Sequence, residues 1–222
     1  MLYQLTHIPP KEVLKLVLGQ QPPEPVPQEL FSQIETASLK ILSCCPRYHY
    51  RIADTQEMLQ YFPGKDIHRH LSSCEQCILL AATLGPQADT LIRRAQVTDM
   101  TKALFLDAAA SAAIEEVCDG VQTQLARKLC RSLTSRFSCG YGDFPLSFQN
   151  EFLSLLNPPA DVGITVSSGG MLIPIKSVTA VIGILPEGTV LTETLKPCSF
   201  CSLYETCILR RKGVFCGKYI DC

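Results

Sequence analysis

The chain has 222 residues, a formal net charge of −1 and 18% charged residues, with no run of basic residues. The broad positive surface that favours nucleic acid or anionic lipid is therefore not expected. Its apolar runs are too short to span a bilayer, and its first residues lack the pattern of a signal peptide. We expect a cytoplasmic protein whose 12 cysteines are kept reduced.

A proline-rich segment at residues 21–28 separates a short N-terminal element from the rest of the chain. Such a composition favours an extended strap rather than a helix. We predict three parts: an N-terminal element with its strap at 1–28, a folded domain at 29–190 and a cysteine-rich tail at 191–222.

Apolar spacing predicts alternating helices and strands in the first half of the domain. Apolar positions from Glu29 to Leu42 predict a helix with one buried face. The continuous apolar run at 78–84 predicts a buried strand, and Gly85-Pro86 predicts the start of a second helix. Thr98 or Asp99 is expected to cap an alanine-rich helix that ends at Gly120.

The second half is predicted to end in paired strands. A helix is expected at about 121–133 and another at 146–156, before Asn157-Pro158-Pro159. Strand-like runs follow at 162–167 and 177–185. The predicted class is α+β, with an antiparallel or mixed sheet flanked by helices.

Residues 136–145, Arg-Phe-Ser-Cys-Gly-Tyr-Gly-Asp-Phe-Pro, combine groups that suit a charged, aromatic ligand. Arg136 offers a planar fork for a carboxylate, and Tyr141 offers a ring face. Glycine lets a ligand approach the main chain. The alternative is an ordinary glycine-containing turn with Arg136 in a surface ion pair.

The pattern Arg-x-Ser-x-Gly-Tyr at Arg136–Tyr141, followed by a helix and by Ile164–Val178, resembles the S-adenosylmethionine-binding activation domain of cobalamin-dependent methionine synthase. The signature of that family, Arg-Pro-Ala-Pro-Gly-Tyr, aligns with these six residues without a gap. The resemblance extends over about residues 75 to 186.

The resemblance implies an activation-domain fold and a role for the signature in binding S-adenosylmethionine. Arg136 would bind the ligand carboxylate, Ser138 and Gly140 would offer main-chain groups, and Tyr141 would pack on the ligand. The partner would be the corrinoid-binding domain of a methionine synthase or another corrinoid methyltransferase, which carries the cobalamin. Methyl transfer to reduced cobalt relies on positioning, so no general base is expected.

The chain departs from the family pattern at two places. Ser111 stands where the family has a ligand-binding glutamate, whereas Glu115 matches the second acidic position of the same helix. A family tyrosine expected beyond Pro186 has no counterpart here. The accessory role in reactivation therefore competes with a second hypothesis, an iron-sulfur or zinc-bearing redox or interaction module that keeps the fold without using S-adenosylmethionine.

The last residues hold a possible metal site. Cys198, Cys201, Cys207 and Cys216 could place four thiolates around zinc or an iron-sulfur cluster. The alternatives are a reduced thiol tail or disulfides formed on oxidation. Corrinoid reactivation needs a low-potential electron, which favours iron-sulfur over zinc if the resemblance holds.

His70, Cys74 and Cys77 have the spacing of a zinc half-site. Simple burial of the two cysteines beside the predicted strand at 78–84 is the competing and favoured interpretation.

Overall fold

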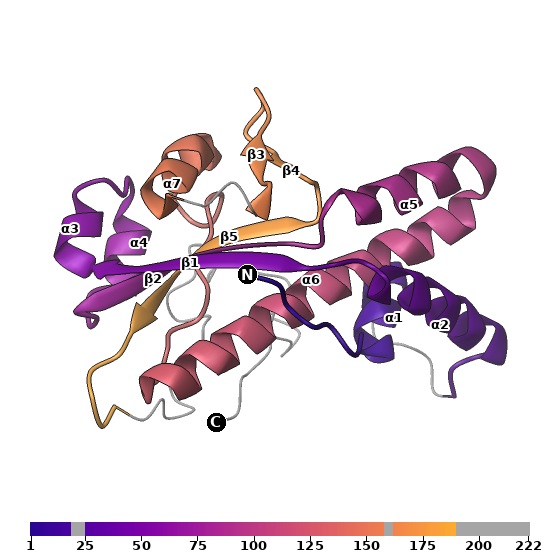
Figure 1. Cartoon of the computed structure of the whole chain (residues 1–222), viewed down its shortest axis with the longest axis horizontal. Helices are drawn as coiled ribbons and strands as arrows, with labels where there is room; N and C mark the ends of the chain where they lie inside the picture. Colours follow the sequence, from indigo (N-terminus) through magenta and orange to yellow (C-terminus); the bar gives the residue numbers. More distant parts are fainter. Residues whose placement is uncertain (19–24, 158–161, 190–222) are drawn as a thin grey trace. The chain divides into compact units, whose positions relative to one another are not determined.

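The computed structural model describes residues 1–18, 25–157 and 162–189, and it has the α+β class that the sequence predicts (Figure 1). The described helices are α1 (Pro10–Leu18), α2 (Gln28–Leu42), α3 (Thr55–Leu59), α4 (Lys65–His70), α5 (Pro86–Thr98), α6 (Met100–Leu129), the 3-10 turn η1 (Leu146–Phe148) and α7 (Gln149–Leu156). The described strands are β1 (Arg47–Asp54), β2 (Gln76–Thr83), β3 (Thr165–Val166), β4 (Leu172–Ile173) and β5 (Ser177–Ile184).

The chain forms two compact units that interleave along the sequence. Unit 1 contains Met1–His49, Ala81–Val121 and the described part of Pro158–Val178. Unit 2 contains Tyr50–Leu80, Gln122–Asn157 and the described part of Thr179–Cys222. Each unit is described by itself below. The division of the chain at residues 28 and 190 stays a prediction.

The three long strands form a sheet in the order β1-β2-β5. Every residue of β2 from Cys77 to Thr83 is buried, which agrees with its central place and with its continuous apolar sequence. The run at 78–84 was correctly predicted as a buried strand. The strands β3 and β4 pair antiparallel as a separate short ribbon.

The edge strand β1 was not predicted, although its sequence alternates. Tyr48, Tyr50 and Ile52 alternate with charged or titratable residues, a period of two that indicates a half-buried strand. Within unit 1, the first residues of the chain pair with the beginning of β1. Tyr48 N–H donates to Met1 O at 2.9 Å, and Tyr3 N–H donates to Pro46 O at 2.9 Å.

The predicted end of a helix at Gly120 is wrong, because α6 continues without interruption to Leu129. A glycine inside a helix costs about 1 kcal/mol relative to alanine, which a 30-residue helix with many buried alanines tolerates. A Cβ at Gly120 would collide with the hydroxyl of Tyr3, so the glycine permits a close approach there. The start of the helix was foreseen, since Asp99 Oδ1 accepts the N–H of Lys102 at 3.0 Å.

The other predicted elements match in place but not always in length. Helix α2 buries Ile34, Ala37 and Ile41 on one face, and α1 packs against it. The strand expected at 162–167 is reduced to Thr165–Val166, because Ser167 already begins a turn in which its N–H donates to Met171 O. No helix within the described residues is long and apolar enough to cross a membrane.

Candidate functional site

The segment that carries Arg136 lies along an edge of β5 within unit 2. Isolated antiparallel bridges join Leu133 to Ile184 and Phe137 to Val181. At the second bridge, Phe137 N–H donates to Val181 O at 2.9 Å and Val181 N–H donates to Phe137 O at 2.8 Å. The family signature has proline at the position of Phe137, which could not donate the first of these bonds. In this chain, pairing with β5 orders the backbone at Phe137, whereas in the signature a proline ring would restrict it.

The turn after Phe137 is closed by its own backbone. Gly140 N–H donates to Phe144 O at 2.7 Å, and Tyr141 N–H donates to Ser138 O at 3.0 Å. Gly140 has φ +94° and Gly142 has φ +53°, values that favour glycine. Of the main-chain groups expected to face a ligand, Gly140 N–H and Ser138 C=O are thus already engaged. Within the described residues, no hydrogen bond is found for Ser138 N–H or Gly140 C=O.

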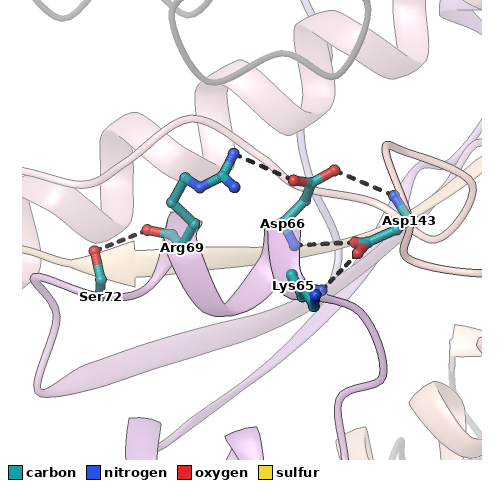
Figure 2. Close-up of polar contacts among 5 residues, drawn as sticks. All are labelled: Lys65, Asp66, Arg69, Ser72 and Asp143. Carbon is teal, nitrogen blue, oxygen red and sulfur yellow. Dashed lines mark hydrogen bonds and ion pairs between the residues drawn. The ribbon is translucent and has the colours of Figure 1, made fainter.

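Two aspartates fasten the far end of this turn to helix α4 (Figure 2). The carboxylate of Asp143 accepts the N–H of Lys65 at 2.6 Å and the N–H of Asp66 at 2.9 Å. In return, Asp66 Oδ2 accepts Asp143 N–H at 3.3 Å, and Asp66 Oδ1 lies 3.4 Å from Arg69 Nη1. We call Asp66 and Asp143 the aspartate latch.

The latch supplies the cap that α4 lacks. Its N-cap residue is Gly64, which has no side chain to accept the N–H groups of the first turn. The backbone N–H donors of Asp66 and Lys65 hold the pKa of Asp143 below its usual range. A Cβ at Gly142 would collide with Asp66 Oδ2. This glycine therefore permits the close approach of Asp66 in the latch.

Arg136 is oriented by a buried glutamine from the end of α6. Its Nη1 donates to Gln122 Oε1 at 3.1 Å, and Gln122 Nε2 donates to Thr134 O at 2.9 Å. Gln122 is 5% exposed. Because an amide is neutral, this hydrogen bond orients the guanidinium without itself cancelling its charge.

Aromatic rings hold the inside of the turn. Phe137 packs edge-to-face on Tyr141 with centroids 6.0 Å apart, and its ring lies 5.1 Å from the His70 ring. Tyr141 keeps 58% of its surface exposed, so its ring is held at one edge and accessible elsewhere. Cys139, at the second proline position of the signature, is buried, and burial raises the pKa of its thiol to about 12. It acts as a packing residue rather than a nucleophile.

His70 is a structural partner of the same segment. Its Nε2 lies 3.0 Å from Ser135 O and 2.9 Å from Thr134 Oγ1. A carbonyl oxygen can only accept, so Nε2 carries the hydrogen. Burial lowers the pKa of His70, and the bond to Ser135 O opposes that shift.

The predicted burial of Cys74 and Cys77 agrees with the structure. Cys74 and Cys77 are buried, and burial raises the pKa of both thiols, that of Cys77 to about 12. The shared helix face that suggested ligand spacing does not form, since α4 ends at His70 and Cys77 lies in β2. Among the residues that the structure describes, no group of three or more potential ligands could hold a metal. The predicted ligands Cys198, Cys201, Cys207 and Cys216 lie outside the described residues.

Unit 1 holds a second polar cluster at a position where the sequence departs from the family. Lys176 Nζ lies 2.8 Å from Asp107 Oδ1 and donates to Ser111 Oγ at 2.8 Å. The lysine side chain is 11% exposed, whereas that of Asp107 is 54% exposed. We call these three residues the lysine cluster. It places a cation against the serine that stands where the resemblance implies a ligand-binding glutamate.

Sequence reasoning missed Gln122, the aspartate latch and Lys176. A single glutamine near the end of an amphipathic helix carries no signal of its own. Asp66 and Asp143 are 77 residues apart, so their reciprocal bonds have no local pattern. Lys176 did have a signal, because it is a lone charge in an otherwise apolar segment from Met171 to Val178.

At the level of sequence, no family model and no curated protein matches the chain. Among solved structures, the chain is similar to the crystal structure of the MetH reactivation domain bound to AdoHcy. That match has 12% sequence identity and a TM-score of 0.57, and it covers 92% of this chain and 83% of that chain. At this identity the likeness is one of fold. The fold implied by the resemblance at Arg136–Tyr141 is thereby confirmed.

Proposed function

We propose that this chain is an S-adenosylmethionine-binding reactivation partner of a corrinoid-dependent methyltransferase such as methionine synthase. It would support the reductive methylation of cob(II)alamin. The observation that carries the proposal is Arg136, oriented by the neutral amide of Gln122 within the family signature. The likeness in fold to the MetH reactivation domain bound to AdoHcy supports it.

The residues of the signature fit the amino-acid end and one face of such a ligand. Arg136 would bind the carboxylate through its guanidinium fork. Ser138 N–H and Gly140 C=O are the main-chain groups that remain for the ligand, and the exposed ring of Tyr141 would pack on it. The bound ligand would supply an electrophilic sulfonium methyl group. The part of these residues is to bind and orient it, because proximity to the acceptor lowers the barrier.

The partner and the cellular compartment are those expected from the sequence. The cobalamin would be carried by the corrinoid-binding domain of the partner, in the cytoplasm. The chain would thus be an accessory to methyl transfer, in the service of methionine biosynthesis if the partner is methionine synthase.

Calorimetric titration of S-adenosylmethionine into wild type, Arg136→Ala and Arg131→Ala tests the proposal under anaerobic conditions. Arg131 is the matched control, because it lies shortly before the segment at 136–145 and pairs with Glu187 at 3.4 Å. We expect Arg136→Ala to weaken binding by about 30-fold, the loss of a charged bidentate contact, and Arg131→Ala to bind as wild type does. No binding by wild type would refute the proposal, and unchanged affinity in Arg136→Ala would refute the role of the guanidinium.

A second candidate function is favoured by the lysine cluster. A carboxylate suits a sulfonium cation, whereas Lys176 beside Ser111 places positive charge at the corresponding family position. On this candidate the chain is an iron-sulfur or zinc-bearing redox or interaction module that does not use S-adenosylmethionine. Residues 191–222 would then form its metal-bearing tail.

Two measurements separate the candidates. Iron, sulfide and zinc analysis of anaerobically prepared wild type and Cys198→Ser/Cys201→Ser tests the tail, and a metal-free wild type would exclude the second candidate. Titration of Ser111→Glu with S-adenosylmethionine tests the cluster. If wild type fails to bind and Ser111→Glu binds, the serine is the cause of the loss.

A further inference from the structure

A pocket lies in unit 1 between helix α2 and the first turns of α6, and the proposed function does not use it. Its volume is about 240 Å³. Both helices belong to the same compact unit, so the pocket is a property of that unit alone. Its lining includes two lysines, Lys40 and Lys102, and the buried ring of Phe105.

The two lysines line the same pocket, one from each of its two helices. Lys40 lies in the last turn of α2, and Lys102 lies in the first turn of α6. Partial burial lowers the pKa of Lys40, and the neighbouring ammonium group of Lys102 lowers it further through a direct side-chain interaction. Two like charges held together in one concave site favour an anion that bridges them.

The remaining polar groups of the pocket suit an anion with several acceptor oxygens. Thr36 and Thr101 add hydroxyl groups that can donate hydrogen bonds. Asp99 also lines the pocket, but its Oδ1 accepts the N–H of Lys102 as the cap of α6. Two lysines against one aspartate leave the lining with net positive charge. The positive end of the α6 dipole acts in the same direction.

We propose that this pocket binds the phosphoryl group of a small organic molecule, with the phosphoryl oxygens between Lys40 and Lys102. Lysine ammonium groups bind phosphate as compact point charges, and the threonine hydroxyls supply neutral donors. The organic part of the ligand would lie against the apolar ring of Phe105. The proposal is independent of the Arg136 site, and its failure would leave the proposed function untouched.

The test is a titration of the full-length protein with phenyl phosphate and with inorganic phosphate at constant ionic strength. We expect saturable binding of both, with phenyl phosphate several-fold tighter because its ring covers apolar surface. Lys40→Gln and Lys102→Gln should each weaken binding by about tenfold, the loss of one charged hydrogen bond. Lys11→Gln is the control, because Lys11 is exposed on α1 and does not line the pocket.

A second readout reports on the pocket directly. In an NMR titration of the lysine ammonium groups, phenyl phosphate should raise the pKa of Lys40, because a bound dianion favours the charged form. Equal weakening in Lys11→Gln, or a Lys40 pKa that does not respond to the ligand, would indicate an adventitious ion only and overturn the proposal. Equal affinity for the two probes would overturn the organic subsite.

Discussion

The segment at 136–145 in unit 2 and the lysine cluster in unit 1 are built in opposite ways. The segment is shaped mainly by backbone bonds, such as Phe137 with Val181 and Gly140 with Phe144. The cluster consists of side-chain contacts of Lys176. Backbone geometry tolerates substitution, because most residues carry the same N–H and C=O groups. A charge arrangement changes with one residue.

This difference bears on where the chain matches the signature that it resembles and where it departs from that signature. Phe137 and Cys139 replace two prolines of the signature, yet strand pairing and burial order the segment in their place. Ser111 replaces an acidic residue, and no backbone group can restore the lost charge. On the proposed function, the segment would bind S-adenosylmethionine, whereas the cluster is the basis of the second candidate function.

The largest loss of stability is expected from Gly142→Ala, which disturbs the backbone of the segment. The new Cβ would collide with Asp66 in the aspartate latch and would sit at a φ of +53°. We expect a loss of about 3 kcal/mol in the free energy of unfolding, measured by urea denaturation.

The matched control for this change is Gly163→Ala. Gly163 has φ +69°, but a Cβ there would meet nothing within 4 Å. It should cost about 1 kcal/mol from the backbone conformation alone. Combining Gly142→Ala with Asp66→Ala should cost less than the sum of the single changes. Equal losses in the two glycine variants would show that the latch is not involved.

A smaller effect is expected from Gln122→Leu, which removes the side-chain support of Arg136. Thr134 O would lose its buried donor, at a cost of about 2 kcal/mol. Gln149→Leu is the control, because Gln149 is equally buried and accepts its 2.7 Å hydrogen bond from Thr179. Both variants should lose similar stability in denaturation, but only Gln122→Leu should weaken S-adenosylmethionine binding in calorimetry. Equal affinities of the two variants for S-adenosylmethionine would show that Gln122 has no role at the ligand site.

The lysine cluster should respond more weakly. Lys176→Met removes an ion pair and a hydrogen bond, and we expect a loss of about 1 kcal/mol in chemical denaturation. Lys15→Met is the control, since Lys15 pairs with Glu12 at a similar 2.9 Å but is 52% exposed. That variant should lose under about 0.5 kcal/mol. A larger loss in Lys15→Met would contradict the importance of burial for the cluster.

The weakest effect is a pH dependence from His70. Burial lowers the pKa of His70 in the folded chain, so the folded state binds the proton less readily than the unfolded state. Its contribution to stability is therefore complete above the unfolded pKa of about 6.5 and is lost as the pH falls through the folded pKa. Thermal unfolding between pH 8 and 5 should show this loss in wild type and in His68→Gln, and less of it in His70→Gln. An identical pH profile in His70→Gln would remove His70 as the cause.

The predictable elements were those whose signals are local. The buried run at 78–84, the Asp99 cap and the helix at 29–42 follow from apolar spacing and capping chemistry. The prediction that a helix ends at Gly120 was wrong, because this glycine accommodates the side chain of Tyr3, more than a hundred residues away in the chain. Strand β1 was missed although its alternation was visible. The candidate site shows the same division, since Arg136 and Tyr141 are proposed from their pattern, whereas Gln122 has no local signal.

By itself, the sequence determined the α+β class and carried the resemblance at Arg136–Tyr141 together with the departure from it at Ser111. These features depend on residue types and short spacings, which can be recognised in the sequence alone. The tertiary structure decided that Gly142 serves the aspartate latch, that Gln122 orients Arg136 and that Lys176 contacts Ser111. The contacts of the latch and of Lys176 join segments distant in the chain, whereas Gln122 lies 14 residues before Arg136. In each case the partners become neighbours only when burial of the apolar core brings their elements together.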